Sequence, residues 1–237
     1  MNNEKAVFAA YFHKVPDPQR GLAWDNTIKP CEGLLESLRK KAMYYVLFHD
    51  GINILKYKSG KTRQYVEVRK PDNHLPNVHR WFIYYEYLLK HPEIEWIWMV
   101  DSTDVEMLKN PFERMRPGVL YVGSEQGQIV ENKWMQSRQE PYFKAPDYRA
   151  IIAAHGDKML INCGLVGGSR DVVMEYLQYV CHYHQRYTIS DTQSTDMACC
   201  NYTVWKHFKS RFDYGVHVNT LFKGYEINNK LAWWKHK

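Results

Sequence analysis

Short apolar runs alternate with helix-like patterns along the first half of this sequence. Runs rich in β-branched and aromatic residues predict strands, whereas residues 76–91 place apolar side chains at helical spacing behind a proline. This alternation favours βαβ units and predicts an α/β fold with a mixed, mostly parallel sheet flanked by helices. No linker divides the chain, so we expect a single domain over residues 1–237. The predicted strands cover residues 5–12, 43–50, 64–70, 95–101, 118–125, 158–169 and 213–222, and the predicted helices cover residues 31–42, 76–91, 170–187 and 191–208.

The segment 95–108, EWIWMVDSTDVEML, ends an apolar run in two acids, Asp101 and Asp104. A wholly apolar strand is typical of a sheet covered on both faces, and such sheets bind ligands beyond the carboxyl ends of their strands. Hard divalent cations prefer oxygen ligands, so the two acids could hold a metal ion that also binds nucleotide phosphates. Alternatively, residues 103–106 fit a capping box, and Asp104 would then lie at the start of a helix.

Two further charged residues are candidates for the same site. Arg80 lies at the head of the predicted helix 76–91, where it could pair with a phosphate or with Asp101, or could be an exposed surface charge. Asp196 lies at the expected start of a helix and could be a functional acid or an N-cap. Each residue therefore has a functional interpretation and a purely structural one.

Three glycines interrupt the predicted strand 158–169, at Gly164, Gly167 and Gly168. Glycine inside a strand marks a bulge or a close approach of the backbone, often to a ligand. The segment is not a P-loop, because no GK[ST] follows it, and the GxGxxG fingerprint of dinucleotide-binding proteins is absent from the chain.

The composition narrows the classes of partner and compartment. A net charge of +6 favours anionic partners such as phosphates and nucleotides, but the basic residues are scattered and no nucleic-acid-binding motif is present, so we expect no nucleic-acid partner. Five cysteines without a CxxC pair argue against a disulfide framework and indicate a reducing compartment. No apolar run approaches the roughly 20 residues of a membrane helix, so we expect a soluble, cytoplasmic protein without a transmembrane segment.

The order of these motifs resembles that of a known family. The first strand is followed by an N-x-x-R helix, VDSTDV, NPF, LYVGSE, NCGLVGGS and a D-x-x-x-x-N helix. From Ala6 to Lys237 this order is similar to that of nucleotide-sugar-dependent glycosyltransferases of the GT-A fold. The resemblance implies a single GT-A domain that uses Mn²⁺ or Mg²⁺ and moves a sugar from a nucleotide-diphosphate donor, UDP favoured over GDP, to a glycan or glycoprotein acceptor. The alternative is a non-catalytic or nucleotidyl-transferring domain that binds sugar nucleotides.

The resemblance also implies a set of metal ligands. The D-x-x-D spacing departs from the family's DxD motif, and Asp104 becomes the favoured direct ligand, with Asp101 on the metal, the ribose or Arg80. His236 would complete the metal shell, and His217 is the competing histidine.

Catalytic, acceptor and donor roles are implied in the same way. Asp196 would be the general base of an inverting enzyme, with Asp191 as the alternative. The polar segment 125–149 would be an acceptor-binding flap or a surface excursion, and Trp134 and Tyr142 are its acceptor-side candidates. The implied donor-binding residues are Ala10, Tyr11, Phe12, Arg80, Asp101, Ser102, Asn162, Gly164 and Lys237.

Overall fold

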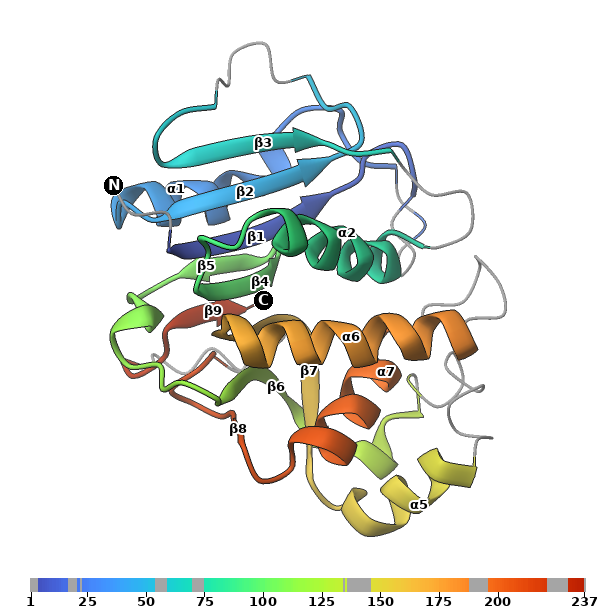
Figure 1. Cartoon of the computed structure of the whole chain (residues 1–237). Coiled ribbons are helices and arrows are strands. Elements are labelled where there is room, and N and C mark those ends of the chain that lie inside the picture. The colour runs from blue at the N-terminus through green and yellow to red at the C-terminus, as the bar shows by residue number, and fades with distance from the viewer. Residues whose placement is uncertain are drawn as a thin grey trace.

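The computed structural model describes residues 4–16, 21, 23–53, 59–69, 75–133, 135, 146–187, 196–220 and 230–236, without the side chains of residues 147, 148 and 187. Its main sheet has seven strands in the order β3-β2-β1-β4-β7-β6-β8, and β7 alone among them runs opposite to the rest (Figure 1). The prediction of an α/β fold with a mixed, mostly parallel sheet is confirmed. The strands are β1 (Lys5–Tyr11), β2 (Tyr44–His49), β3 (Arg63–Glu67), β4 (Trp96–Asp101), β6 (Leu120–Gln128), β7 (Met159–Ser169) and β8 (Phe212–Asp213).

Helices and a small second sheet cover the main sheet on both faces (Figure 1). The helices within the described ranges are α1 (Glu32–Lys40), α2 (Pro76–Lys90), α5 (Pro146–His155), α6 (Arg170–Tyr187), α7 (Asp196–Thr203), the π-helical turn η4 (Val204–Phe208) and the 3-10 turns η1 (Lys29–Cys31), η2 (Pro111–Glu113) and η3 (Ile129–Glu131). α2, α6 and α7 pack on one face, and α1 packs on the other. The second sheet lies on the α1 side and pairs β5 (Val105–Met107) antiparallel with β9 (Trp234–His236).

Strand β4 shows why the central strands are apolar throughout. Ile97 and Met99 belong to the core under α2 and α6, whereas Trp98 and Val100 belong to the core on the α1 side. Side chains alternate between the two faces of a strand, so a strand covered on both sides needs apolar residues at every position. Burying each large apolar side chain stabilises the fold by roughly 1.5–3 kcal/mol. The first polar residue, Asp101, comes where β4 reaches the edge of the sheet.

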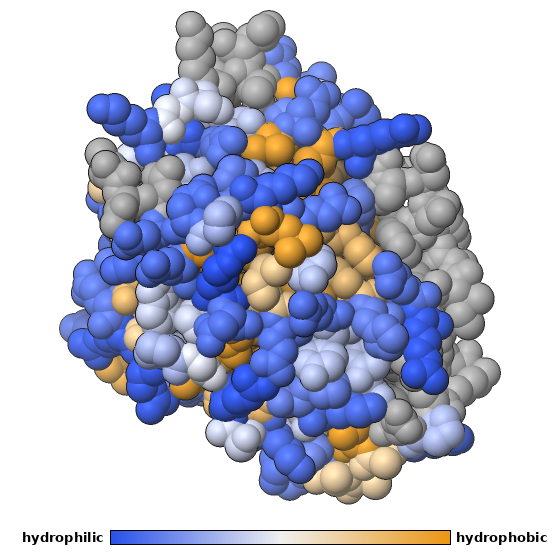
Figure 2. Space-filling model, viewed as in Figure 1, coloured by the Kyte–Doolittle hydropathy of each residue, from blue (hydrophilic) through white to orange (hydrophobic). Residues whose placement is uncertain are grey.

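The outer surface of the α2–α6 face is mostly hydrophilic, with apolar residues in small separate patches (Figure 2). This pattern is typical of helices that bury one face against a sheet and expose the other to water. Among the described residues, no helix is both long enough and apolar enough to cross a membrane.

Strand β7 changes register along its contact with β6. Val122 pairs with Val166, but the next residue of β6, Gly123, pairs with Asn162. Residues 163–165 of β7 are therefore extra relative to β6 and form a bulge, which agrees with the glycine-based prediction for this strand. Bulges re-aim backbone and side chains locally, and this one lies beside the carboxyl end of β4.

Two predictions about secondary structure are wrong. Residues 105–107 form strand β5, so no helix begins at Asp104 and the capping-box interpretation fails. The predicted strand 213–222 is reduced, in its described part, to the end of β8 and an isolated bridge at Asn219. Gly215 interrupts it, because this residue has a φ of +118° and its carbonyl oxygen accepts the hydrogen bonds of a turn.

Several elements were not predicted, among them β5, β9 and α5. The polar segment 125–149 is partly regular, because β6 continues to Gln128, η3 follows, and α5 begins at Pro146. Its two acceptor-side candidates, Trp134 and Tyr142, lie outside the described residues. All five cysteines are buried free thiols.

Candidate metal centre at the carboxyl edge of the sheet

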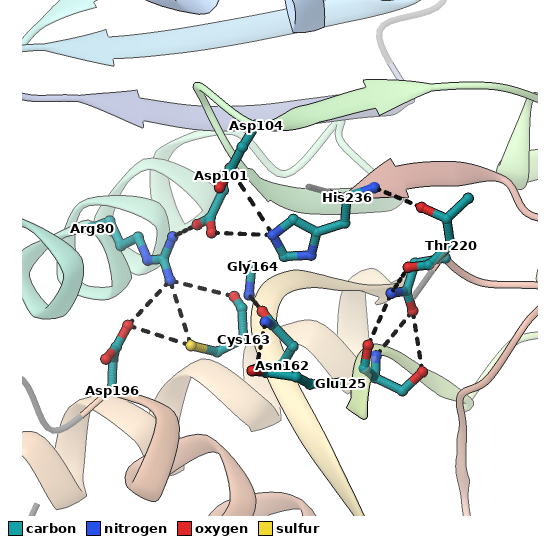
Figure 3. Close-up of polar contacts among 12 residues, drawn as sticks. Arg80, Asp101, Asp104, Glu125, Asn162, Cys163, Gly164, Asp196, Thr220 and His236 are labelled. Atoms are coloured by element: carbon teal, nitrogen blue, oxygen red, sulfur yellow. Dashed lines mark hydrogen bonds and ion pairs between the residues drawn. The ribbon is translucent and has the colours of Figure 1, made fainter. Parts of the chain in front are cut away.

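Three side chains from separate elements converge beyond the end of β4 (Figure 3). Asp101 is the last residue of β4, Asp104 lies in the turn before β5, and His236 is the last residue of β9. β5 and β9 pair Val105 with His236, so the small sheet carries the imidazole to the turn that holds Asp104. One ligand atom of each of the three side chains lies within 4.8 Å of the other two.

The donor atoms of this group have the spacing and chemistry of a divalent-metal site. His236 Nε2 lies 3.7 Å from Asp101 Oδ2 and 4.0 Å from Asp104 Oδ1. Two ligands that each lie about 2.1 Å from one ion are at most about 4.2 Å apart, so both separations suit a shared ion. Carboxylates and imidazole are common ligands of divalent ions in proteins. The group could therefore hold a metal ion.

The group is buried on its histidine side and accessible on its carboxylate side. The His236 side chain is 1% exposed, whereas those of Asp101 and Asp104 are 31% and 27% exposed. Burial alone would raise the pKa of Asp101, but the Arg80 guanidinium and the His236 imidazole together lower that pKa below its usual value. Asp101 is therefore ionised at neutral pH, which is the form that binds a cation.

Gly164 closes the site from the side of β7. Its neighbour Leu165 pairs with Val100 of β4, so Gly164 lies beside Asp101. A Cβ atom at position 164 would lie 2.5 Å from Asp101 Oδ2 and 2.5 Å from His236 Cε1. Only glycine lets the β7 backbone approach these two side chains so closely.

The other two glycines of β7 serve core packing. A Cβ atom at Gly167 would lie 2.4 Å from the Trp98 ring, and one at Gly168 would lie 2.5 Å from Val172 Cγ1. The close approach that the sequence predicts at these two positions is thus to buried side chains.

Arg80 lies between two carboxylates at the base of the site (Figure 3). It is 9% exposed, and its Nη1 donates to Asp101 Oδ1. Its Nη2 lies 3.5 Å from Asp196 Oδ2 and 3.4 Å from the Cys163 carbonyl oxygen. The interpretation of Arg80 as an exposed surface charge is wrong, and the alternative in which it pairs with Asp101 is confirmed. One guanidinium therefore links the end of β4 to the start of α7.

Asn201 explains why Asp196 can reach this guanidinium. The Asn201 side chain accepts a hydrogen bond from the Ile161 N–H at 3.1 Å and donates to the Ile161 carbonyl at 2.9 Å. It is 1% exposed, and its amide also donates to the Met197 carbonyl. Buried, fully hydrogen-bonded amides of this kind fix two elements in one arrangement. The D-x-x-x-x-N pattern is thus a clamp that fixes α7 to β7, with Asp196 at the end nearest Arg80.

Three buried residues that the sequence did not single out, Ser124, Asn219 and Thr220, support His236. Thr220 Oγ1 accepts a hydrogen bond from the His236 N–H at 3.0 Å. Asn219 accepts from the Ser124 N–H at 2.9 Å and donates to the Ser124 carbonyl at 3.0 Å. The sign of two of them in the sequence is the adjacent polar pair Asn219–Thr220 within the predicted strand 213–222.

The predicted donor-binding residues Ala10, Tyr11 and Phe12 lie at the edge of the sheet that carries the metal centre. Ala10 pairs with Asp101 across β1 and β4. Tyr11 and Phe12 follow it, but they are 3% and 5% exposed, and the Tyr11 hydroxyl donates to the Asp25 carbonyl at 2.7 Å. These two rings therefore support the edge from within the core, and Ala10 is the half-buried residue next to the metal centre.

One remaining donor-binding candidate, Asn162, lies on β7 and accepts a hydrogen bond from the Gly164 N–H at 2.7 Å. The other candidates either lie within the described residues, as His217 and Ser102 do, or lie outside them. His217 lies 3.3 Å from Asp213 and packs edge-on against Trp233, so the geometry favours His236 over His217. Ser102 is buried in the turn between Asp101 and Asp104. The candidates outside the described residues are Asp191, Trp134, Tyr142 and Lys237.

Comparison with known proteins found no protein-family model that matches this sequence and no match among curated proteins. The assignment of the site therefore rests on its geometry and on the chemistry of its side chains.

Proposed function

We propose that this chain is a metal-dependent glycosyltransferase of the GT-A fold, which transfers a sugar from a nucleotide-diphosphate donor to a glycan or glycoprotein acceptor. The observation that supports this most directly is the Asp101–Asp104–His236 group at the carboxyl edge of a mostly parallel sheet. We favour UDP over GDP as the nucleotide. We favour Mn²⁺ over Mg²⁺, because an imidazole nitrogen suits a transition metal better than it suits Mg²⁺.

The position of the group within the sheet supports a nucleotide ligand. The chain runs from β1 outward through β2 to β3, and then returns to place β4 on the other side of β1. The strand order therefore reverses between β1 and β4, where Ala10 pairs with Asp101. Open α/β sheets bind ligands at such a switch point, beyond the carboxyl ends of the strands.

Each side chain of the site would have a separate role in the reaction. Asp101, Asp104 and His236 would hold the ion, which would stabilise the negative charge on the departing diphosphate. Arg80 keeps Asp101 ionised and fixes the direction of its carboxylate through their ion pair. Gly164 leaves the site free of side-chain atoms on the β7 side.

We assign Asp196 to holding Arg80 in place, in preference to the general-base role that the family resemblance implies. A general base must lie within hydrogen-bond reach of the acceptor hydroxyl. Asp196 is 5% exposed, and its Oδ2 already accepts from Arg80 and from the Cys163 thiol. Proton abstraction would require this carboxylate to leave both donors.

Thermal unfolding in the presence of sugar nucleotides tests the proposal. The native protein is heated with UDP-sugars and GDP-sugars, each with Mn²⁺, with Mg²⁺ and with a chelator. A ligand at 100 times its Kd stabilises the native state by about 2.7 kcal/mol, which raises the Tm of a chain of this size by roughly 5–10 °C. We expect such a shift with a UDP-sugar and Mn²⁺, and its loss with the chelator.

Two variants make this test specific to the site. Asp101→Ala/Asp104→Ala is expected to abolish the shift, whereas Asp157→Ala, which removes an exposed carboxylate paired with Lys158, is expected to retain it. The absence of a shift with every nucleotide would refute the proposal. A metal-dependent shift without sugar transfer to any acceptor would identify a sugar-nucleotide-binding domain instead of an enzyme.

A further inference from the structure

Two neighbouring residues in the middle of β6, Ser124 and Glu125, begin hydrogen-bond chains that both end at the metal centre. Figure 3 shows the chain that begins at Glu125. One chain runs from Ser124 through the Asn219–Thr220 segment to the backbone of His236. The other runs from Glu125 to the glycine that lies against the ligands. The second chain includes a half-exposed carboxylate with no role in the proposed function.

The Glu125 chain fixes the orientation of one buried amide. Asn162 Nδ2 donates to Glu125 Oε2 at 3.1 Å, and Asn162 Oδ1 accepts from the Gly164 N–H at 2.7 Å. An ionised carboxylate can only accept hydrogen bonds, so the amide NH₂ must face Glu125 and the amide oxygen must face Gly164. Asn162 is 6% exposed, so little water competes for either bond.

The bulge in β7 makes this side-chain bond necessary. Residues 163–165 are extra relative to β6, so the ladder between β6 and β7 does not set the position of the Gly164 N–H. The bond to Asn162 Oδ1 sets it instead. Because a Cβ atom at position 164 would lie 2.5 Å from both Asp101 Oδ2 and His236 Cε1, a small shift of this backbone would press on both ligands.

We infer that Glu125 is a positioning residue of the metal centre, acting through Asn162 and Gly164 to hold Asp101 and His236 at their separation. The inference rests on the proposed function, because it assumes that these side chains bind a metal ion. In Figure 3 the hydrogen bond of Glu125 leads to Asn162, so its effect on the ligands passes through two hydrogen bonds.

The test measures the binding of Mn²⁺ alone, by isothermal titration calorimetry and by the electron paramagnetic resonance signal of free Mn²⁺. Hydrogen-bond partners of metal ligands are worth about 10–100-fold in metal affinity, and Glu125 acts further out, so we expect Glu125→Ala to weaken Mn²⁺ binding about fivefold. Glu125→Gln keeps an acceptor oxygen for Asn162 and is expected to bind Mn²⁺ within about twofold of wild type. The matched control is Glu131→Ala, which removes an exposed carboxylate from the turn η3 just after β6.

The outcomes separate this inference from the proposed function. Wild-type protein that does not bind Mn²⁺ would overturn both. If the wild-type protein binds Mn²⁺ and Glu125→Ala binds it with the same affinity, the inference is overturned but the metal site stands. The same holds if Glu131→Ala weakens Mn²⁺ binding as much as Glu125→Ala does. Equal weakening by Glu125→Gln and Glu125→Ala would also overturn it, because the acceptor oxygen would then be irrelevant. If Glu125→Ala does not fold, Glu125→Ser, whose short side chain cannot reach Asn162, repeats the measurement.

Discussion

The two halves of the main sheet are held together in different ways, and the candidate metal centre lies where they meet. In the half formed by β3, β2, β1 and β4, all strands are parallel and each pairing is continuous. In the half formed by β7, β6 and β8, β7 is antiparallel and its pairing with β6 shifts register twice. Three buried amides, Asn162, Asn201 and Asn219, bond to the backbone in this second half.

The difference explains what each half contributes to the site. The regular half brings Asp101 to the end of β4 and Arg80 to the second turn of α2. The irregular half brings Gly164 against Asp101 and holds His236 through Thr220. Hydrophobic alternation is thus sufficient to place charges at the ends of elements, whereas hydrogen-bonded amides set the distances across the junction.

The largest effect is expected when the ionic link between the halves is removed. Arg80→Met leaves Asp101 and Asp196 without their shared cation in a buried environment. Removing one partner of a buried ion pair typically costs about 3–5 kcal/mol, and we expect about 3 kcal/mol here because Asp101 is partly exposed. Urea denaturation at pH 7 measures the change in the free energy of unfolding.

Two further variants calibrate this result. Arg39→Met removes an exposed guanidinium that pairs with Glu36 at 3.0 Å, and it should cost less than about 1 kcal/mol. Adding Asp196→Asn to Arg80→Met removes one of the unpaired charges and should restore part of the lost stability. If Arg80→Met lowered the free energy of unfolding as little as Arg39→Met, the ion pairs of Arg80 would not be what joins the two halves.

Substitutions of Gly164 and Gly167, which lie on the same strand, should distinguish an effect on metal binding from an effect on core packing. Gly167→Ala forces a methyl group to within 2.4 Å of the Trp98 ring and should cost about 2 kcal/mol with little change in Mn²⁺ affinity. Gly164→Ala meets Asp101 and His236 instead, and should weaken Mn²⁺ binding about tenfold or more by displacing ligands. Urea denaturation and Mn²⁺ titration are performed on both variants. If both lose the same amount of stability and the same amount of Mn²⁺ affinity, the two glycines do not have different roles.

A smaller loss of stability is expected when the hydrogen bond that supports the backbone of His236 is removed. Thr220→Val keeps the shape of the side chain but removes the oxygen that accepts the His236 N–H at 3.0 Å, in a site where both residues are buried. A buried donor without a partner costs about 1–3 kcal/mol, and we expect the lower end of this range in the free energy of unfolding. Thr27→Val is the control, because Thr27 also accepts a backbone N–H, from Lys29, but at the exposed surface. Equal effects of the two substitutions would argue against a special role for Thr220.

The sequence predicts the regular half of the fold well, for a physical reason. Strands such as β4 and helices such as α2 are long enough for their apolar periodicity to be visible in the sequence. Once the bounds of such a strand are known, the residue at its end, here Asp101, is known to lie at the edge of the sheet. Strands β5 and β9 have three residues each, and β8 has two, so no periodicity can be read from them. Their existence depends on pairing with segments far away in the chain.

The site is predictable only in part for the same reason. The two aspartates follow from the strand end, and a pairing of Arg80 with Asp101 is one of the alternatives that its place on a helix allows. His236 was chosen by resemblance to a family and not from the pattern around it. The Asn162 and Asn219 hydrogen bonds could not be predicted, because each depends on a register shift or turn that local sequence does not encode.

The smallest expected effect concerns the pH dependence of stability in the metal-free protein. The folded-state pKa of Asp101 lies below the ordinary value of about 3.9 that it takes in the unfolded chain. The stability that Asp101 contributes is therefore fully present above about pH 4, and it is lost as the pH falls through the unfolded value toward the folded one. Urea unfolding between pH 3 and pH 6, with a chelator, should show the difference between wild type and Asp101→Asn shrinking toward pH 3. Parallel profiles would mean that ionisation of Asp101 does not stabilise the fold, and that Arg80 joins the two halves by contact and not by charge.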